Sequence, residues 1–359
     1  MVSMQPPSLT SAQALMPLPE RLETEAELDE LLTRPRPVLV GFVRTLSSPL
    51  VVLGAGGKMG PTLAVLARRA AEAARHPLEV VAVSRFGDGK ARAWLEERGV
   101  QTRSCDLLDR EQVSRLPESE NVVYLVGLKF GTSEDPASTW AVNTLVPALV
   151  VERYGQARIA ALSTGNVYPL SSIAGGGARE SHPLTPLGEY SNAAVARERI
   201  FEFASRRKGA RLALLRLFYA CELRYGVLLD LARKVHRGES VDLANGRFNC
   251  IWQGDANEMA LRALALASSP PSSWNLCRPE VHSVRDVAVA LGRLLHCEPH
   301  FLGVEAETAL IGDASRIRDA LGTPAVELET MLRWVAHWVS IGGRELGKPT
   351  HFEVRDGRY

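Results

Sequence analysis

The segment "LVVLGAGGKMGPTLAVLARRAAEAAR" (residues 50–75) decides the fold. Its first four residues are apolar and predict a short buried strand, and its last fifteen residues predict a helix. Between them, Gly54, Gly57 and Gly60 are spaced so that backbone amides and a helix N-terminus can face one point. A Cβ at these glycines would block the turn, the ligand or the packing of the helix. The segment therefore predicts a site for the pyrophosphate of a dinucleotide.

Strands and helices continue to alternate after this segment. The apolar pattern predicts further strands at 78–84, 100–106, 121–127 and 157–164, and helices at 90–99 and 138–155. Alternation at this spacing indicates βαβ units. The predicted fold class is α/β, with a Rossmann-type doubly wound parallel sheet and a smaller α-rich lobe near the C-terminus.

The texture of the sequence changes near residue 220 and indicates how the chain is divided. Four helical stretches follow, at 226–238, 255–267, 284–296 and 327–343. An amphipathic stretch from Pro19 to Leu32 predicts a short helix before the first strand. We expect an N-terminal extension (1–48), a dinucleotide-binding domain (49–220), a substrate-binding lobe interleaved with it (221–345) and a C-terminal tail (346–359).

Composition excludes several classes of function. The 42 Lys and Arg residues nearly balance the 41 Asp and Glu residues, so no overall field favours nucleic acid or an anionic membrane. The sequence has neither a signal peptide nor a long apolar run, and we expect a cytoplasmic protein without a membrane partner. No metal site is predicted, because the scattered cysteines lack a Cys-x-x-Cys pair. The cysteines are Cys105, Cys221, Cys250, Cys277 and Cys297.

The end of the second strand bears on the identity of the dinucleotide. A carboxylate there would hold the ribose of NAD, whereas arginine accommodates the 2′-phosphate of NADP. Ser84 and Arg85 stand at this position without an acid, which favours NADP slightly over NAD. An exposed arginine after a strand is also typical of a solvated charge. Asp106, after the third strand, suits the adenine side of the site, and a loop cap is an equally good interpretation.

Several motifs occur in an order that resembles one family. The glycine turn is followed by "CDLLD", "WAVNT", "LSTGNVY", "LLRLF", "GDANEMA" and "DASRIRDALG". This succession, over residues 50–340, resembles the extended short-chain dehydrogenase/reductases, and among them the NAD(P)-dependent nucleotide-sugar epimerases and dehydratases. The resemblance implies a Rossmann domain for the cofactor, a C-terminal lobe for the substrate, and a homodimer formed through a bundle that includes the tyrosine-bearing helix.

The glycine motif and the resemblance together give a set of expected cofactor contacts. They lie in the glycine turn, at the ends of the next three strands and on the helix after the fourth strand. They are Gly54, Gly56, Gly57, Lys58, Met59, Gly60, Ser84, Arg85, Asp106, Leu107, Val126, Gly127, Leu128 and Asn143.

The resemblance also implies catalytic residues. In "STGNVYP" the family's hydroxyl position is Thr164, with Ser163 as the alternative, and its role is to bind the oxygen of the substrate. A hydroxyl cap that begins a loop is the structural alternative. The family tyrosine corresponds to Tyr190, which would exchange the proton of a substrate alcohol. Glu198 matches the acidic residue that closes the motif.

The helix "YSNAAVARE" departs from the family pattern at one position. The family has a lysine four residues after the tyrosine, and this chain has Ala194. A free tyrosine has a pKa of about 10, so a nearby cation is needed for proton exchange near neutral pH. We expect Lys129, in the loop after the fourth strand, to replace that cation or to bind an anionic group of the substrate. A solvated loop lysine is an equal alternative, and Arg197 is the poorer candidate because it lies about two helical turns from Tyr190.

Substrate contacts are expected in three loops, on weaker grounds. The segment "FYACELRYG" has Tyr219 where the family commonly has asparagine and Glu222 where it commonly has glycine. The substrate lobe is therefore atypical, and Trp252 fits a core position equally well. The candidates for substrate binding are Asn166, Arg224, Tyr225, Asn249, Trp252 and Gln253.

These features predict an enzyme that transfers a hydride between NAD(P) and a secondary alcohol of a sugar or sugar-derived substrate. Epimerase, dehydratase and dehydrogenase outcomes all remain compatible with the sequence. The alternative is a dinucleotide-binding sensor or scaffold without catalysis, which the absent lysine at Ala194 favours and the retained Thr164, Tyr190 and Glu198 oppose.

Overall fold

The computed structural model describes residues 17–87, 89–129, 131, 134–348 and 350–358. The first 16 residues of the expected N-terminal extension lie outside the described residues. Within the described ranges, no helix combines the length and apolar character that crossing a membrane requires.

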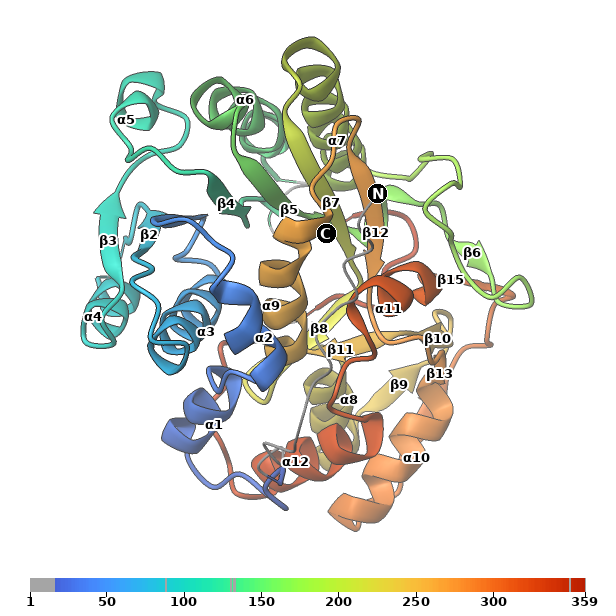
Figure 1. The fold of residues 1–359 in the computed structure, drawn as a ribbon. Helices are drawn as coiled ribbons and strands as arrows, with labels where there is room; N and C mark the ends of the chain where they lie inside the picture. The colour runs from blue at the N-terminus through green and yellow to red at the C-terminus, as the bar shows by residue number, and fades with distance from the viewer. Residues whose placement is uncertain (1–16, 88, 130, 132–133, 349, 359) are drawn as a thin grey trace, which may run out of the picture.

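Seven parallel strands form the central sheet, in the order β12-β7-β5-β4-β1-β2-β3 (Figure 1). The order reverses between β1 and β4, where a doubly wound sheet opens a crevice at the carboxyl ends of its strands. The predicted fold class is confirmed. The strands are β1 (Leu50–Leu53), β2 (Val80–Ser84), β3 (Gln101–Ser104), β4 (Asn121–Tyr124), β5 (Arg158–Thr164), β7 (Arg211–Leu217) and β12 (Ser272–Leu276).

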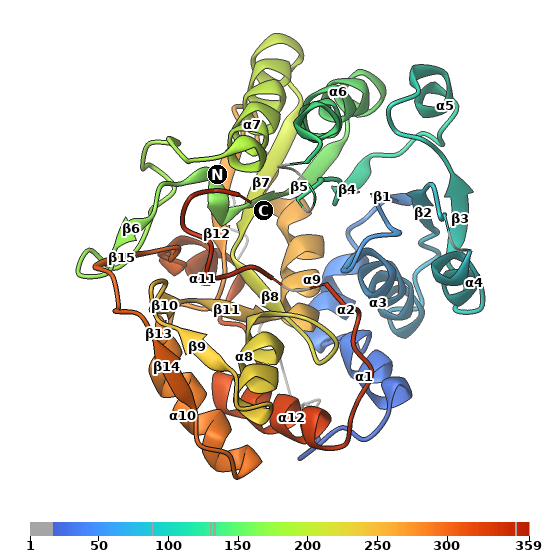
Figure 2. The same ribbon diagram turned by 180° about the vertical axis from the view of Figure 1, so that it is seen from behind.

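Alternate residues of β1 and β2 face two separate cores. Val52 and Ala82 pack on the side of the first helix group, and Val51 and Val83 pack on the side of the second group. Helices therefore cover both faces of the sheet (Figures 1 and 2). The first group is α2 (Pro37–Val43), α3 (Gly60–Ala73), α4 (Lys90–Glu96) and α9 (Gln253–Arg262), and the second is α5 (Arg110–Ser114), α6 (Pro136–Tyr154) and α7 (Glu189–Lys208).

A third apolar core lies beyond the carboxyl ends of the strands. It is built by α8 (Val227–His236), α10 (Val284–Leu295) and α12 (Leu328–Ser340), and α1 (Glu25–Leu32) adds Leu28 and Leu32 to it. Short paired strands, a short helix and two single turns complete the described structure. They are β6 (Ser171–Ser172), β8 (Tyr219–Cys221), β9 (Ser240–Asp242), β10 (Arg247–Phe248), β11 (Cys250–Trp252), β13 (His282–Ser283), β14 (His300–Leu302), β15 (Thr308–Ala309), α11 (Ser315–Leu321), η1 (Gly165–Val167) and η2 (Ala263–Leu266).

The N-terminal extension is fastened to both parts of the chain. The indole nitrogen of Trp334 in α12 donates to the carbonyl oxygen of Pro19 (2.9 Å). Arg36, which precedes α2, forms two hydrogen bonds with the carboxylate of Glu258 in α9 (2.6 and 2.7 Å). The described part of the extension therefore packs as part of the fold.

The chain after α12 returns across the molecule. We call residues 344–348 and 350–358 the carboxyl-terminal strap. In Figure 2 this dark red stretch rises from α12 and ends near the label C, beside the middle of the sheet. Phe352 is buried in the third core with 1% of its surface exposed, so the strap is part of the packed structure.

Candidate functional site

The glycine turn joins β1 to α3 and leaves no room for most side chains. A Cβ on Gly60 would lie 2.6 Å from Cα of Ala55, and one on Gly56 would lie 2.6 Å from Oγ of Ser84. Gly54 has φ +81, a conformation that favours glycine. A Cβ on Gly57 would have only an ordinary contact, 3.4 Å from the carbonyl oxygen of Gly54. The backbone is therefore accessible from one side, as a pyrophosphate site requires.

This turn opens onto a cavity of about 570 Å³, which we call the turn cavity. Glycine backbone forms one part of its wall, and strap residues form another. Its lining residues are Gly54, Gly57, Lys58, Met59, Gly60, Leu125, Gly127, Lys129, Leu162, Gly347, Lys348 and His351. The strap residues were not expected from the sequence, because they show no motif or apolar period.

Two lysines of the turn cavity have lowered pKa values. Burial lowers the pKa of Lys58 to about 8, and the charge of Lys348 adds to this effect. Burial also lowers the pKa of Lys129 to about 8, with a further contribution from Lys58. Burial disfavours the charged form of a lysine, and nearby like charges act in the same direction. The turn cavity is thus a site of concentrated positive charge.

A second cavity of about 220 Å³, the tyrosine cavity, adjoins the first. It brings together the three expected catalytic residues Thr164, Tyr190 and Lys129. Leu125, Gly127, Lys129 and Leu162 line both cavities, so the two form neighbouring parts of one groove. The remaining lining residues are Val126, Ser163, Asn166, Arg197, Leu217, Phe218, Tyr219 and Leu310.

A buried polar network fixes the end of β5. Ser163 donates to the Glu198 carboxylate (2.5 Å), and Arg216 forms an ion pair with the same carboxylate (2.7 Å). Arg216 also donates to the hydroxyl of Tyr168 (2.6 Å). Thr164, in contrast, caps the following turn by accepting a hydrogen bond from the Asn166 amide (3.2 Å). Ser163 and Thr164 both line the tyrosine cavity: the Ser163 hydroxyl donates into the network, and the Thr164 hydroxyl donates to Oδ1 of Asn166 (3.0 Å).

Arg197 is a buried cation beside the tyrosine cavity, with 3% of its surface exposed. Its Nη1 donates to Oδ1 of Asn143 (3.0 Å) and to the carbonyl oxygen of Val126 (3.1 Å). A Cβ on Gly127 would lie 2.8 Å from this nitrogen, so glycine leaves space for the guanidinium. The spacing along α7 made Arg197 the poorer candidate for a cation near Tyr190. Its long side chain nevertheless reaches the backbone of Val126 and lines the tyrosine cavity.

The other expected cofactor contacts lie around this groove and at the tips of β2 and β3. Arg85 is exposed directly after β2, and half-buried Ser84 lies against Gly56 of the turn. Asp106 accepts a hydrogen bond from the amide of Leu108 (3.0 Å), the loop-capping arrangement that the sequence also suggested. Leu107 is buried, and the carbonyl oxygen of Leu128 accepts a bond from the Asn143 amide group (3.3 Å).

Tyr225 and Gln253, two of the expected substrate contacts, are bonded to each other beside Lys58 of the turn cavity. The ring centroid of Tyr225 lies 4.5 Å from Nζ of Lys58, and its hydroxyl donates to the amide oxygen of Gln253. The amide nitrogen of Gln253 donates to Thr62 in α3 (3.0 Å). Arg224 bonds to Glu222 and to Asp29 of α1 (both 3.0 Å). Of the six candidates, Asn166 lines the tyrosine cavity.

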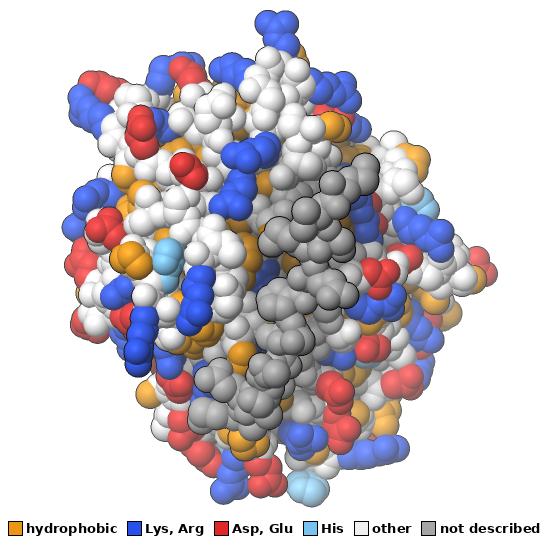
Figure 3. Space-filling model, viewed as in Figure 1, with side chains coloured by type: hydrophobic (Ala, Val, Ile, Leu, Met, Phe, Trp, Pro, Cys, Tyr) orange, Lys and Arg blue, Asp and Glu red, His pale blue; other side chains and the backbone are white. Residues whose placement is uncertain are grey.

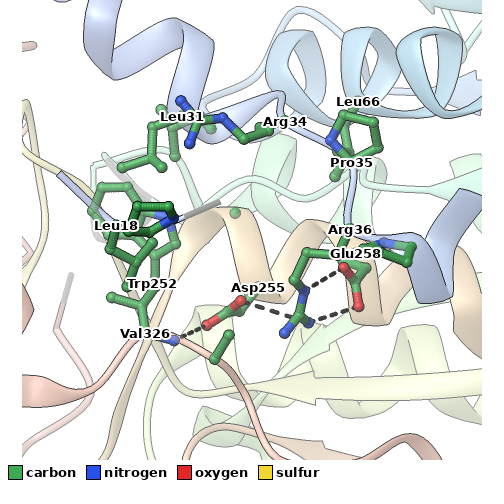
Figure 4. A pocket seen from close by; sticks show the side chains of 15 residues that line it. Leu18, Leu31, Arg34, Pro35, Arg36, Leu66, Trp252, Asp255, Glu258 and Val326 are labelled. Carbon is green, nitrogen blue, oxygen red and sulfur yellow. Dashed lines mark hydrogen bonds and ion pairs between the residues drawn. The ribbon is translucent and has the colours of Figure 1, made fainter. Parts of the chain in front are cut away.

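The remaining two candidates lie elsewhere. Asn249 is fully buried, and its amide group both donates to and accepts from the backbone of Gly312 (3.1 and 2.8 Å). Trp252 packs edge-on against Trp334, with ring centroids 5.1 Å apart. It also lines a separate cavity of about 470 Å³ below α2. In Figure 4, Arg36 reaches between Glu258 and Asp255 in the wall of that cavity.

Metal ligands and surface charge give no competing site. Within the described ranges, no group of three or more His, Cys, Asp or Glu side chains is placed to hold a metal ion. Positive and negative side chains are interspersed over the face shown in Figure 3, around the grey residues. The groove formed by the turn and tyrosine cavities is therefore the best candidate for a functional site.

Solved structures similar to this one include three epimerases of UDP-sugars. UDP-glucose 4-epimerase of Thermotoga maritima, solved with UDP-glucose, has a TM-score of 0.64 and 20% identity over 81% of this chain and 98% of its own. The UDP-Glc/GlcNAc 4-epimerase of Campylobacter jejuni has a TM-score of 0.66 and 19% identity over 82% and 99%. UDP-glucuronic acid 4-epimerase of Bacillus cereus, in complex with NAD, has a TM-score of 0.67 and 18% identity over 81% and 96%. At these identities the likeness shows the fold.

A search of curated proteins gave no match. The sequence pattern of the family described as "NAD dependent epimerase/dehydratase family" matches residues 50–277, which is more than half of the chain. The matched region contains the glycine turn, Thr164 and Tyr190, and it ends one residue after β12. The family expected from the order of motifs is thus confirmed, and this chain belongs to the NAD-dependent epimerase/dehydratase family.

Proposed function

We propose that this protein is an NAD(P)-dependent enzyme that transfers a hydride at a secondary alcohol of a sugar nucleotide. One observation carries the proposal: Thr164, Tyr190 and Lys129 line a cavity that shares its wall with the cavity of the glycine turn. A dinucleotide bound at the turn would extend along this groove toward Tyr190. The similar structures that act on UDP-sugars support a sugar nucleotide as the substrate.

The side chains have separable roles in the proposed reaction. Thr164 binds the oxygen of the substrate alcohol, and the Tyr190 oxygen takes its proton. When bound, the nicotinamide accepts the hydride from the same carbon. Return of the hydride to the opposite face of the resulting ketone would give an epimer. Asn166 lines the same cavity and is proposed to contact the substrate.

Lys129 is proposed to supply the positive charge that Ala194 does not. It lines both cavities, and with a pKa of about 8 it is mostly protonated near neutral pH. A cation in the tyrosine cavity stabilises a negative tyrosine oxygen during proton exchange. Arg197 lines the tyrosine cavity and donates from Nη1 to Asn143 and Val126. We assign the electrostatic assistance to Lys129, because it lines the turn cavity as well as the tyrosine cavity.

We propose that Arg85 enables the protein to bind NADP as well as NAD. It is exposed at the tip of β2, where the 2′-phosphate of NADP would lie. Wild type is expected to bind NADP at least as tightly as NAD. Arg85→Ala is expected to raise the dissociation constant for NADP about tenfold and to leave that for NAD unchanged. Equal effects on both cofactors would contradict a 2′-phosphate contact.

Activity is tested with purified protein, NAD or NADP, and a panel of UDP-sugars, by following the absorbance of reduced nicotinamide and the sugar products. Tyr190→Phe is expected to lower turnover about a hundredfold or more while cofactor affinity is retained. Lys129→Ala should lower turnover and shift its pH profile, and Lys208→Ala, at the exposed end of α7, serves as the matched control.

Two outcomes would reject this assignment. Full turnover in Tyr190→Phe would exclude the tyrosine from proton exchange. Cofactor binding without product from any UDP-sugar, and without reduction of bound cofactor, would favour the dinucleotide-binding sensor or scaffold. An unchanged pH profile in Lys129→Ala would exclude Lys129 as the substitute cation while leaving the proposed reaction intact.

We further propose a homodimer formed through α6 and α7. These helices pack side by side, and they expose Trp140, Leu145 (56% exposed) and Phe203 (65% exposed) (Figure 1). Burial of exposed apolar side chains is the main source of free energy for association. Leu145→Glu combined with Phe203→Glu is expected to halve the mass measured by light scattering. Val304→Glu, on an 84% exposed residue after β14, is the control.

The cytoplasm is proposed as the location of the protein. All five cysteines are free thiols, and four of them are buried. A reducing compartment suits such thiols, because disulfides form mainly in oxidising compartments. A fluorescent fusion found in another compartment would contradict this proposal.

A further inference from the structure

The carboxyl-terminal strap runs from the substrate lobe to the loop that precedes Tyr190. Near its end, Arg355 donates to the carbonyl oxygens of Ala244 (2.9 Å) and Thr308 (2.7 Å). Gly357 then lies against Gly188, the residue before α7: a Cβ on Gly188 would be 2.1 Å from the carbonyl oxygen of Gly357. Figure 2 shows this path over the molecule. The strap thus ends against the residue that precedes α7.

Hydrogen bonds hold the strap on both sides of Lys348. Before it, the amide of Leu346 donates to the carbonyl oxygen of Arg224 (3.0 Å). After it, the amide and hydroxyl of Thr350 donate to the carboxylate of Asp230 in α8 (2.8 and 2.6 Å). The backbone of Lys348 is therefore held in position by hydrogen-bonded residues on both sides.

The strap faces the glycine turn across the turn cavity. Gly347, Lys348 and His351 line this cavity together with Gly54 and the other turn residues. Contact between the two walls is direct, because Nζ of Lys58 donates to the carbonyl oxygen of Lys348 (3.4 Å). A ligand on the glycine backbone would thus have the strap as its opposite wall.

Charge in the turn cavity favours an anionic ligand. Lys58, Lys129 and Lys348 line it. The charge of Lys348 lowers the pKa of Lys58, and the charge of Lys58 lowers the pKa of Lys129. His351 also lines it, and Asp230 and Glu222 act on Lys58 with the opposite sign. Three lysines around one cavity repel one another, and an anion with two charges would relieve that repulsion.

We propose that the carboxyl-terminal strap completes the dinucleotide site, with Lys348 binding the pyrophosphate from the side opposite the glycine turn. This inference rests on the proposed function, since it requires a dinucleotide in the turn cavity. It adds a cofactor-positioning residue that lies outside the matched family region, residues 50–277. A sugar nucleotide also carries a pyrophosphate, so the test must separate the two sources.

The test is calorimetric titration of wild type, Lys348→Gln and the control Lys208→Gln with NAD, ADP-ribose and UDP. We expect Lys348→Gln to raise the dissociation constants for NAD and ADP-ribose about tenfold each, because both contain the pyrophosphate. Lys208 is exposed, about 27 Å along α7 from Tyr190, and its variant should bind like wild type.

Each other result has a defined meaning. No binding of NAD or NADP by wild type would reject the proposed function itself. Wild-type affinity of Lys348→Gln for NAD would reject the strap inference alone. Loss confined to UDP would assign Lys348 to the substrate, and loss for NAD but not for ADP-ribose would assign it to the nicotinamide end, and either result overturns the inference.

A second measurement uses only wild type and does not depend on the folding of a variant. Hydrogen exchange of backbone amides should slow in residues 344–353 when NAD is added, because the strap then closes on a bound ligand. Amides of residues 146–154 in α6, whose buried side chains pack in a different core from Phe352 of the strap, serve as the internal reference. Unchanged exchange in the strap with protection in the glycine turn would contradict the inference.

Discussion

Arg197 donates a hydrogen bond from Nη1 to Oδ1 of Asn143 over 3.0 Å, which joins α7 to α6 beside the tyrosine cavity. Arg197→Leu would leave Asn143 and the carbonyl oxygen of Val126 without this donor. We expect the free energy of unfolding to fall by about 1–3 kcal/mol. Urea denaturation measures it, and Arg199→Leu, at an exposed position of the same helix, is the matched control. Equal stability of the two variants would contradict a fixing role for the pair.

Alanine substitutions at Gly57 and Gly60 should distinguish an effect on cofactor binding from an effect on folding. The Cβ of Gly60→Ala would overlap Ala55, so its melting temperature should fall, with a loss of about 1–3 kcal/mol. The Cβ of Gly57→Ala meets only an ordinary contact and projects from the exposed turn, so this variant should melt like wild type. It should still bind NAD at least about tenfold more weakly, because the backbone approach is blocked. Tight NAD binding by Gly57→Ala would place the cofactor elsewhere.

Because Glu198 and Arg216 form a buried ion pair, we expect a single substitution to lower stability much more than its share of a double substitution. Both side chains are about 95% buried, with 4% and 5% of their surface exposed. Glu198→Ala is expected to cost about 3–5 kcal/mol, because it leaves the Arg216 guanidinium buried without its partner. Glu198→Leu with Arg216→Met should cost less than the sum of the single changes. Additive costs in a double-mutant cycle would show that the two charges are independent.

Cofactor affinity should decrease at alkaline pH. The pKa values of Lys58 and Lys129 lie at about 8 in the free protein because burial disfavours their charged forms. A bound pyrophosphate favours those charged forms and raises both pKa values, so the complex holds more protons than the free protein above about pH 8. The dissociation constant for NAD should therefore be steady below that pH and rise above it.

The measurement is titration with NAD at about pH 7 and about pH 9, in two buffers with different ionisation enthalpies. Proton uptake on binding should be detected at the higher pH and be small at the lower one. Proton release at about pH 9 would contradict the expected direction of the pKa shifts.

Most of the central sheet could be predicted from the sequence. Residues 50–53 and 159–161 are buried throughout, and continuous apolar runs that are buried on both faces are typical of parallel strands. The strand predicted at 121–127 ends earlier, at Tyr124, because the next residues form the walls of the cavities. Helix α2 was missed, since "PVLVGFV" is apolar throughout and shows no helical period.

The site was predictable where topology places residues together. Parallel strands carry their carboxyl ends to one edge, so Thr164 after β5 and Lys129 after β4 meet in one cavity. The strap was not predictable, because Lys348 contacts Lys58 across 290 positions of sequence without any motif. Nor does the sequence distinguish a ligand-binding amide from a buried structural one, and Asn249 bonds to Gly312.

The network that begins at Ser163 has a further consequence for ligand binding. Its hydrogen bonds connect β5, α7 and β7, so the backbone that carries Thr164 is immobilised when the chain folds. Thr164 therefore loses its conformational freedom when the chain folds. Substrate binding does not have to order it again, so little conformational entropy is lost at this position on binding. In this protein the rigidity of the hydroxyl that we propose to bind the substrate oxygen arises from an ion pair that no ligand needs to touch.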